Sequence, residues 1–136
     1  MRRMPTAPTQ ATPRRVLVTG GTSGIGAGIA AAFAAAGDIV VATGATAAEV
    51  EAAAASGPAS IERRVLDVRD GEAVTALVAG LGELDVVVNC AGVIRRGAEH
   101  DPVAFAETID INLTGTMRVC AAARAGLAAR QGCIVN

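Results

Sequence analysis

Short apolar runs alternate along the chain with longer segments of helical periodicity. The apolar runs are rich in Val, Ile and Leu on both faces, which is typical of strands buried inside a sheet. They predict strands over residues 15–19, 38–43, 61–66, 84–89 and 133–135. Because a helical segment separates each strand from the next, the pattern predicts a parallel sheet.

The segments between the strands carry helix signals. Thr46 followed by Glu49 forms a capping-box pattern, and Asp101 followed by Pro102 begins another helix. In residues 24–36, Ile25, Ile29 and Phe33 recur every four residues and predict one apolar stripe. Helices are predicted over residues 24–36, 46–55, 70–81, 101–110 and 112–130. The fold class is therefore α/β, a Rossmann-type doubly wound parallel sheet with helices on both faces.

Composition narrows the class of protein. The chain has 136 residues, 51% hydrophobic and 18% charged, which favours a packed aliphatic core. A net charge of −1 gives no electrostatic footprint for nucleic acid, and no apolar run is long enough for a membrane span. Residues 1–13 are rich in Arg and Pro and predict a disordered tail, with a targeting peptide as the alternative. Residues 14–136 form the predicted domain.

Three cysteines, Cys90, Cys120 and Cys133, are odd in number and far apart in sequence. Without a C-x-x-C pair they indicate neither a metal site nor a disulfide framework. We therefore expect small buried thiols in a reducing cytoplasm and no bound metal. The single histidine, His100, is expected in a surface loop.

A glycine-rich stretch, "TGGTSGIG" at residues 19–26, joins the first strand to the first helix. Gly20 permits a tight turn, Gly24 lets backbone approach a pyrophosphate, and Gly26 lets the helix lie close to the sheet. The helix N-terminus then presents free N–H groups to an anion. A P-loop is excluded because no Gly-Lys-Ser/Thr follows.

Four motifs in order resemble classical short-chain dehydrogenases/reductases. They are Thr19-Gly20-x-x-x-Gly24-x-Gly26, "LDV" at residues 66–68, "NCAG" at 89–92 and "INLTG" at 111–115. The extended branch of the family, which includes nucleotide-sugar epimerases, explains "NCAG" poorly. Cys90 stands where the family usually has a second Asn, and we expect it to be a structural thiol.

This resemblance implies an NAD(P)-dependent oxidoreductase that transfers a hydride between a nicotinamide and a small alcohol or ketone. It assigns Asp67 to the adenine amine and Asn112 to catalysis. The cofactor-binding residues implied are Gly20, Thr22, Ser23, Gly24, Ile25, Gly26, Thr43, Asp67, Val68, Asn89, Ala91 and Gly92.

The family's catalytic Ser, Tyr and Lys have no counterpart in this chain, which contains no Tyr at all. We expect them beyond Asn136, so that residues 14–136 are the N-terminal, five-strand part of the domain and the C-terminal catalytic part is absent from the chain. The interpretation we favour is part of a working enzyme. The alternative is a catalytically silent dinucleotide-binding fragment or interaction module.

The type of cofactor depends on the end of the second strand. Thr43, Gly44 and Ala45 are all uncharged there, and so is Ser23 in the glycine loop. With no basic residue to hold a 2′-phosphate, the sequence favours NAD(H) over NADP(H), and both stay open.

Substrate and partners are implied by the same resemblance. "NCAGVIRR" is similar to sugar-acid dehydrogenases of the deoxygluconate type, with Val93 and Ile94 near the nicotinamide and Arg95 and Arg96 meeting an anionic substrate. Two solvated loop arginines are the alternative. Small residues along 112–130 imply a homo-oligomer, a dimer or a tetramer, although burial within one subunit would explain the same residues.

Overall fold

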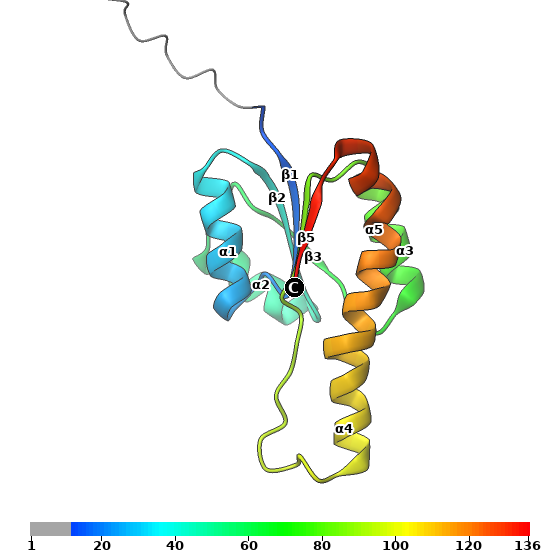
Figure 1. Cartoon of the computed structure of the whole chain (residues 1–136). Coiled ribbons are helices and arrows are strands. Elements are labelled where there is room, and N and C mark those ends of the chain that lie inside the picture. Colours follow the sequence, from blue (N-terminus) through cyan, green and yellow to red (C-terminus); the bar gives the residue numbers. More distant parts are fainter. Residues whose placement is uncertain (1–11) are drawn as a thin grey trace, which may run out of the picture.

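The computed structural model describes residues 12–136, and its centre is one five-stranded sheet (Figure 1). All neighbouring strands are parallel, and their order is β3-β2-β1-β4-β5. The strands are β1 (Arg15–Thr19), β2 (Ile39–Gly44), β3 (Glu62–Val65), β4 (Val86–Asn89) and β5 (Cys133–Val135). The predicted parallel sheet is confirmed, while most of the expected tail, residues 1–11, lies outside the described residues.

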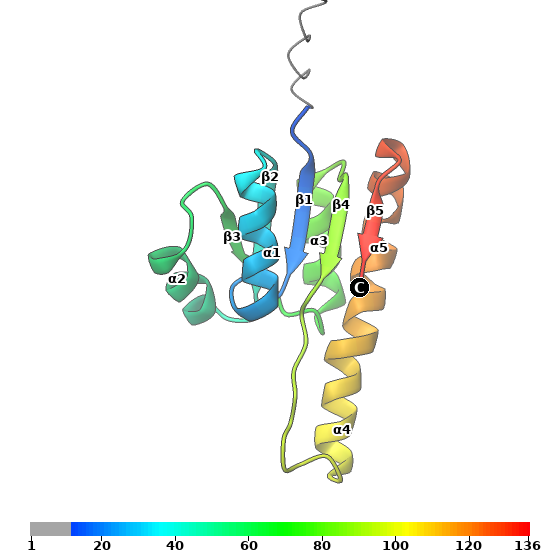
Figure 2. The same ribbon diagram turned by 60° about the vertical axis from the view of Figure 1, so that its left-hand side comes forward.

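Helices cover both faces of this sheet, as a doubly wound fold requires (Figures 1 and 2). The elements are α1 (Gly24–Ala35), α2 (Ala47–Ser56), α3 (Gly71–Leu81), α4 (Pro102–Ile109), η1 (Asp110–Gly115) and α5 (Thr116–Arg130). Thr46 caps α2 and Asp101 caps α4, as predicted. The Rossmann-type fold class is therefore confirmed.

Alternate residues of each central strand enter two separate cores. Leu17 and Val87 face α3 and α5, where they pack with Val74, Val119 and other aliphatic side chains. On the opposite face, β1 and β4 residues pack against Ala30 of α1. Both central strands are thus buried on both sides, which explains their continuous apolar sequence.

The apolar stripe predicted on α1 is only partly correct. Ile29 and Phe33 pack against the core, but the side chain of Ile25 is 81% exposed. The residues of α1 that are fully buried are Gly26 and Ala30. At the first turn of α1, Gly26 lies so close to the backbone of Gly20 that a larger residue would not fit.

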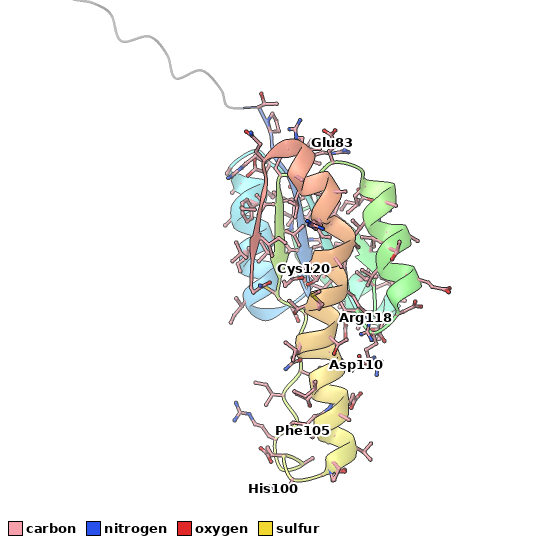
Figure 3. The ribbon with its side chains drawn as sticks, turned by 45° about the vertical axis from the view of Figure 1, so that its right-hand side comes forward. Glu83, His100, Phe105, Asp110, Arg118 and Cys120 are labelled. Atoms are coloured by element: carbon pink, nitrogen blue, oxygen red, sulfur yellow. The ribbon has the colours of Figure 1, made fainter. Side chains whose placement is uncertain are left out.

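The two helices predicted over 101–110 and 112–130 form one continuous rod. η1 is a π-helix that joins α4 directly to α5. The predicted gap between two helices is therefore wrong, and a wider helical turn takes its place. Arg118 spans this segment: its guanidinium lies 2.8 Å from the Asp110 carboxylate and donates to the backbone carbonyl of Val68 (Figure 3). The rod is thereby attached to the segment that follows β3.

The carboxyl ends of the strands all lie at one end of the sheet, and α4 and the loop after β4 project from that end (Figures 1 and 2). Strand order reverses between β1 and β4, whose neighbours β2 and β5 continue in opposite directions. Such a switch point leaves a crevice where two loops part, and ligands bind there in open α/β sheets. The loops after β1 and β4 are the glycine-rich stretch and "NCAG".

Candidate dinucleotide-binding site

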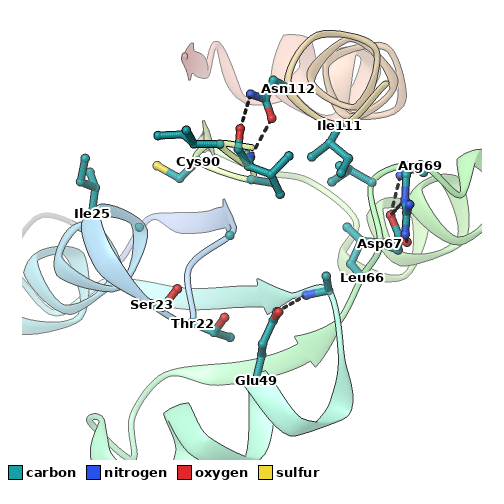
Figure 4. Close-up of a pocket in the computed structure, with 18 residues that line it drawn as sticks. Thr22, Ser23, Ile25, Glu49, Leu66, Asp67, Arg69, Cys90, Ile111 and Asn112 are labelled. Atoms are coloured by element: carbon teal, nitrogen blue, oxygen red, sulfur yellow. Dashed lines mark hydrogen bonds and ion pairs between the residues drawn. The ribbon is translucent and has the colours of Figure 1, made fainter. Parts of the chain in front are cut away.

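A pocket of about 510 Å³ lies at this switch point (Figure 4). Its walls come from the loops after β1, β2, β3 and β4, from the first turns of α1 and α2, and from η1. The lining residues are Gly20, Thr22, Ser23, Ile25, Gly26, Ala45, Glu49, Leu66, Asp67, Val68, Arg69, Cys90, Ala91, Gly92, Val93, Ile94, Ile111 and Asn112. Four sequence motifs far apart along the chain therefore meet in one cavity.

Two glycines of the glycine loop, Gly20 and Gly26, are packed so tightly that a side chain would not fit. Gly20 has φ +64°, and a Cβ there would lie 2.7 Å from the backbone of Ala91. A Cβ on Gly26 would collide with the carbonyl oxygen of Gly20. Gly24 has φ +53° and open space around it, so its conformation rather than its surroundings requires glycine. Backbone thus forms this wall of the pocket.

The N-terminus of α1 has no side-chain cap, whereas α2, α3 and α4 all have one. Thr46, Asp70 and Asp101 accept hydrogen bonds from the first-turn amides of their helices. Ser23 is the N-cap residue of α1, but its side chain makes no such bond, and the first turn contains no acidic residue. The amides of α1 that open on the pocket are therefore available to an anion.

"NCAG" contributes to the pocket through Cys90, Ala91 and Gly92. Asn89 points elsewhere: its amide nitrogen donates to Cys120 Sγ and to Asn136 Oδ1, and its buried Oδ1 has no partner among residues 12–136. Burial raises the pKa of the Cys90 thiol, which keeps it protonated and fits a structural role.

Asp67 lies in the pocket wall just beyond β3. Arg69 holds it, with Nη2 2.6 Å from Oδ2 and a backbone N–H that donates to Oδ1. These hydrogen bonds hold the pKa of Asp67 below its ordinary value. The carboxylate stays ionised and remains an acceptor for an amine.

Asn112 connects η1 to the loop after β4. Its Oδ1 accepts from the Val93 amide at 2.8 Å, and its Nδ2 donates to the Val93 carbonyl at 2.9 Å (Figure 4). Gly92 lies beside this contact, because a Cβ there would come within 3.3 Å of Asn112 Oδ1. Both polar atoms of the side chain thus position backbone, while the Asn112 carbonyl accepts from the Thr116 hydroxyl.

The end of β2 differs from the expectation for Thr43. Its side chain is fully buried, its hydroxyl has no partner among the described residues, and it does not line the pocket. Ala45 and Glu49 line the pocket there instead. Thr46 Oγ1 accepts from the Glu49 amide, which is one half of the predicted capping box. The other half differs, because Glu49 Oε2 accepts at 2.7 Å from the amide of Ala45, one residue before the N-cap Thr46.

The two loop arginines are not equivalent. Arg95 pairs with Glu107 of α4, Nη2 to Oε1 at 3.1 Å, and Glu107 also pairs with Arg69. Arg96 is exposed and has no ion pair within residues 12–136. Neither lines the main pocket, but Arg95 borders an adjacent cavity of about 300 Å³ between the loop and α4.

The structure brings together most of the residues expected at the site. Gly24, Thr43, Asn89, Arg95 and Arg96 are the expected residues that do not line the pocket. Lining residues that the sequence analysis did not assign are Ala45, Glu49, Leu66, Arg69, Cys90 and Ile111. Leu66, Cys90 and Ile111 belong to the quoted motifs and Ala45 to the end of the second strand, so their neighbourhood was recognised in the sequence. Glu49 and Arg69 were not connected with the pocket.

Comparison with known proteins agrees with this geometry. A family model for short chain dehydrogenases matches residues 14–136. The chain belongs to the short chain dehydrogenase family. A 2-keto-3-deoxy-L-fuconate dehydrogenase of Xanthomonas campestris pv. campestris is 39% identical over 98% of this chain and 45% of its own length. Human L-xylulose reductase is 36% identical over 90% of this chain and 52% of its own.

Solved structures of short chain dehydrogenases have the same fold. A short-chain dehydrogenase from Streptomyces avermitilis has a TM-score of 0.80 and 31% identity, over 92% of this chain and 49% of that one. A 2-keto-3-deoxy-D-gluconate dehydrogenase from Streptococcus agalactiae has a TM-score of 0.74 and 29% identity, over 89% and 49%. The chain spans about half the length of these relatives.

The pocket fits the dinucleotide that this family uses. Gly20 and Gly26 keep side chains out of the phosphate loop, the α1 amides are uncapped, and the Asp67 carboxylate is ionised. Within the part of the chain that the structure describes, no three His, Cys, Asp or Glu side chains form a metal-binding group. Over the same residues, no helix has the length and apolarity to cross a membrane.

Proposed function

We propose that the protein is an NAD(P)-dependent oxidoreductase acting on a small alcohol or ketone. The observation that carries this proposal is the pocket where the glycine loop, "LDV", "NCAG" and "INLTG" meet. The bound nicotinamide would supply or accept the hydride. Glycine-loop amides and the α1 N-terminus would hold the pyrophosphate, and Asp67 the adenine amine.

Asn112 is the candidate catalytic residue in this chain. Its side chain fixes Val93, so the loop beside the reacting end of the pocket has one defined backbone position. In the family this Asn acts through its carbonyl, and a π-turn at this point is consistent with a functional role. The proton donor, a Tyr by family resemblance, is not among the residues of this chain.

A sugar acid is the proposed substrate class. Support comes from the names of two relatives, both dehydrogenases of 2-keto-3-deoxy sugar acids. Arg96 is exposed, follows the pocket residues Val93 and Ile94 in sequence, and has no ion pair within the described residues, so its charge is available to a carboxylate. Arg95 is the weaker candidate because Glu107 already neutralises it.

The proposed partner is a second copy of the chain, and the proposed location is the cytoplasm. The rod carries large exposed side chains at every fourth position, Phe105, Ile109, Leu113 and Met117. We name these four residues the rod stripe. An apolar row on a projecting helix suits a two-fold helix–helix contact. Three free cysteines support the reducing cytoplasm.

Titration with NADH tests the function. Because the chain has no Trp or Tyr, the fluorescence of the nicotinamide can be followed with little interference from the protein. We expect saturable binding of NADH. In the full-length protein, addition of a 2-keto-3-deoxy sugar acid should reduce NAD⁺ to NADH, because the relatives are named as dehydrogenases of such acids. An uncharged sugar of the same length should react more weakly. Absence of NADH binding would contradict the function; equal rates with both sugars would contradict only the substrate class.

A further inference from the structure

Glu49 places a carboxylate in the pocket wall at the end of β2. It belongs to the first turn of α2, and its side chain reaches back to the Ala45 amide (Figure 4). Gly44 lies between it and the glycine loop, because a Cβ on Gly44 would come 2.8 Å from Thr22 Oγ1 and 3.1 Å from Glu49 Cβ. The carboxylate therefore lies beside the phosphate loop, although four residues of sequence separate it from Gly44.

The charge of Glu49 is not neutralised by the residues around it. Its Oε2 accepts from the Ala45 amide, and its other oxygen has no hydrogen-bond partner among residues 12–136. The remaining charged residues of the pocket wall, Asp67 and Arg69, pair with each other at 2.6 Å. The pocket wall thus carries one net negative charge, located at the end of β2.

We propose that Glu49 sets the preference of this site for NAD(H) over NADP(H). The two cofactors differ at the ribose 2′ position, which dinucleotide-binding folds recognise at the end of the second strand. A carboxylate there can accept from a ribose hydroxyl and repels a 2′-phosphate, for which no pocket arginine is left unpaired among the described residues. This inference rests on the proposed function and assigns a specificity role to a residue outside the strand end itself.

A helix cap alone would explain the same contact between Glu49 and Ala45. Replacing Glu49 with Gln separates the two roles, because Gln retains an acceptor for the Ala45 amide but carries no charge. Glu51→Gln is the matched control: it removes the same charge from the same helix at an exposed position that does not line the pocket. The measurement is the dissociation constant of NADH and of NADPH for each protein.

We expect the wild-type protein to bind NADH at least tenfold more tightly than NADPH. Glu49→Gln should strengthen NADPH binding about tenfold and leave the melting temperature unchanged. Glu51→Gln should not change the ratio. Salt gives an independent readout, since screening at 1 M should narrow the wild-type ratio but not that of Glu49→Gln.

Two results would overturn the inference while leaving the function intact. One is a wild-type preference for NADPH. The other is a wild-type preference for NADH that persists unchanged in Glu49→Gln, which would show that Glu49 is only a cap. Failure of the wild-type protein to bind either dinucleotide would overturn the proposed function, and the inference with it.

Discussion

The ion pair between Arg14 and Asp38 links the amino ends of the neighbouring strands β1 and β2. Asp38, just before β2, accepts from the Arg14 amide at 3.0 Å and from Arg14 Nη2 at 2.6 Å. Arg14 also lies over the ring of Phe33, 5.2 Å from its centroid, and links the start of β1 to α1. The Asp38 side chain is only 6% exposed, so losing its partner leaves a poorly solvated charge.

Because of Asp38, we expect the free energy of unfolding to fall in acid. Its hydrogen bonds with Arg14 hold the pKa of Asp38 below its ordinary value of 3.8. Its contribution is therefore complete above about pH 4 and is lost as pH falls through the lower, folded pKa. Asp38→Asn should destabilise the protein by about 2 kcal/mol at pH 7 and by much less at pH 2.

Urea unfolding at both pH values measures this difference. Glu51→Gln, a change at an exposed carboxylate without an ion pair among the described residues, should alter stability little at either pH. If Asp38→Asn lowers the free energy of unfolding equally at pH 7 and pH 2, packing rather than charge stabilises this contact.

At the scale of elements, α1 differs from α2, α3 and α4 in having no side-chain cap at its N-terminus. α2, α3 and α4 satisfy their first-turn amides with their own side chains, whereas α1 leaves them open where they face the pocket. α1 also makes its closest contact with small residues, Gly26 and Ala30. The N-terminus of α1, where a phosphate could bind, therefore has neither a side-chain cap nor a large apolar side chain at its close contact.

Two glycines in α1 allow a matched test of this close contact. Gly26→Ala should cost about 2 kcal/mol and abolish NADH binding, because its Cβ would collide with the Gly20 carbonyl. Gly28→Ala, two residues along the same helix, meets nothing within 4 Å and should stabilise the protein by up to about 1 kcal/mol. Thermal unfolding and NADH titration measure both. Tight NADH binding by Gly26→Ala would contradict the close-contact role of this glycine.

At the scale of the whole molecule, the rod projects beyond the sheet (Figure 3). Its largest exposed apolar side chains form the rod stripe. Leu113 and Met117 are 63% and 65% exposed, although Gly115, midway between them in sequence, is buried. An apolar stripe of this kind is costly to leave in water. Contact with a second rod would remove it from solvent.

Leu113→Arg should therefore weaken self-association of the protein. Two like charges facing each other across a two-fold contact repel, and the buried apolar area is lost. Sedimentation velocity should show a shift towards the monomer. Val65→Arg introduces the same charge at an exposed apolar position on the edge strand β3, and its oligomeric state should match the wild type. An unchanged assembly in Leu113→Arg would exclude the rod stripe as the interface.

Local patterns in the sequence predicted the elements and their caps. Val-rich runs indicated buried parallel strands, and Thr46 and Asp101 marked helix starts, because these signals depend on residues close together in the chain. Strand ends shifted by one or two residues, as for β2 and β4, since hydrogen bonding to neighbouring strands decides where a strand begins. The glycine loop was also recognisable, because its conformational requirements are local.

Tertiary structure decided what lies around the site. The pairing of β1 with β2 brought Glu49 beside the glycine loop, and packing buried Thr43, although both residues lie near the end of β2 in sequence. The π-turn at η1 and the exposure of Ile25 were also not predicted from the sequence and were found only in the tertiary structure. The sequence by itself determined the parallel α/β architecture and the phosphate loop. Packing alone decided which charges face the pocket, because a side chain's direction depends on neighbours that are distant in the chain.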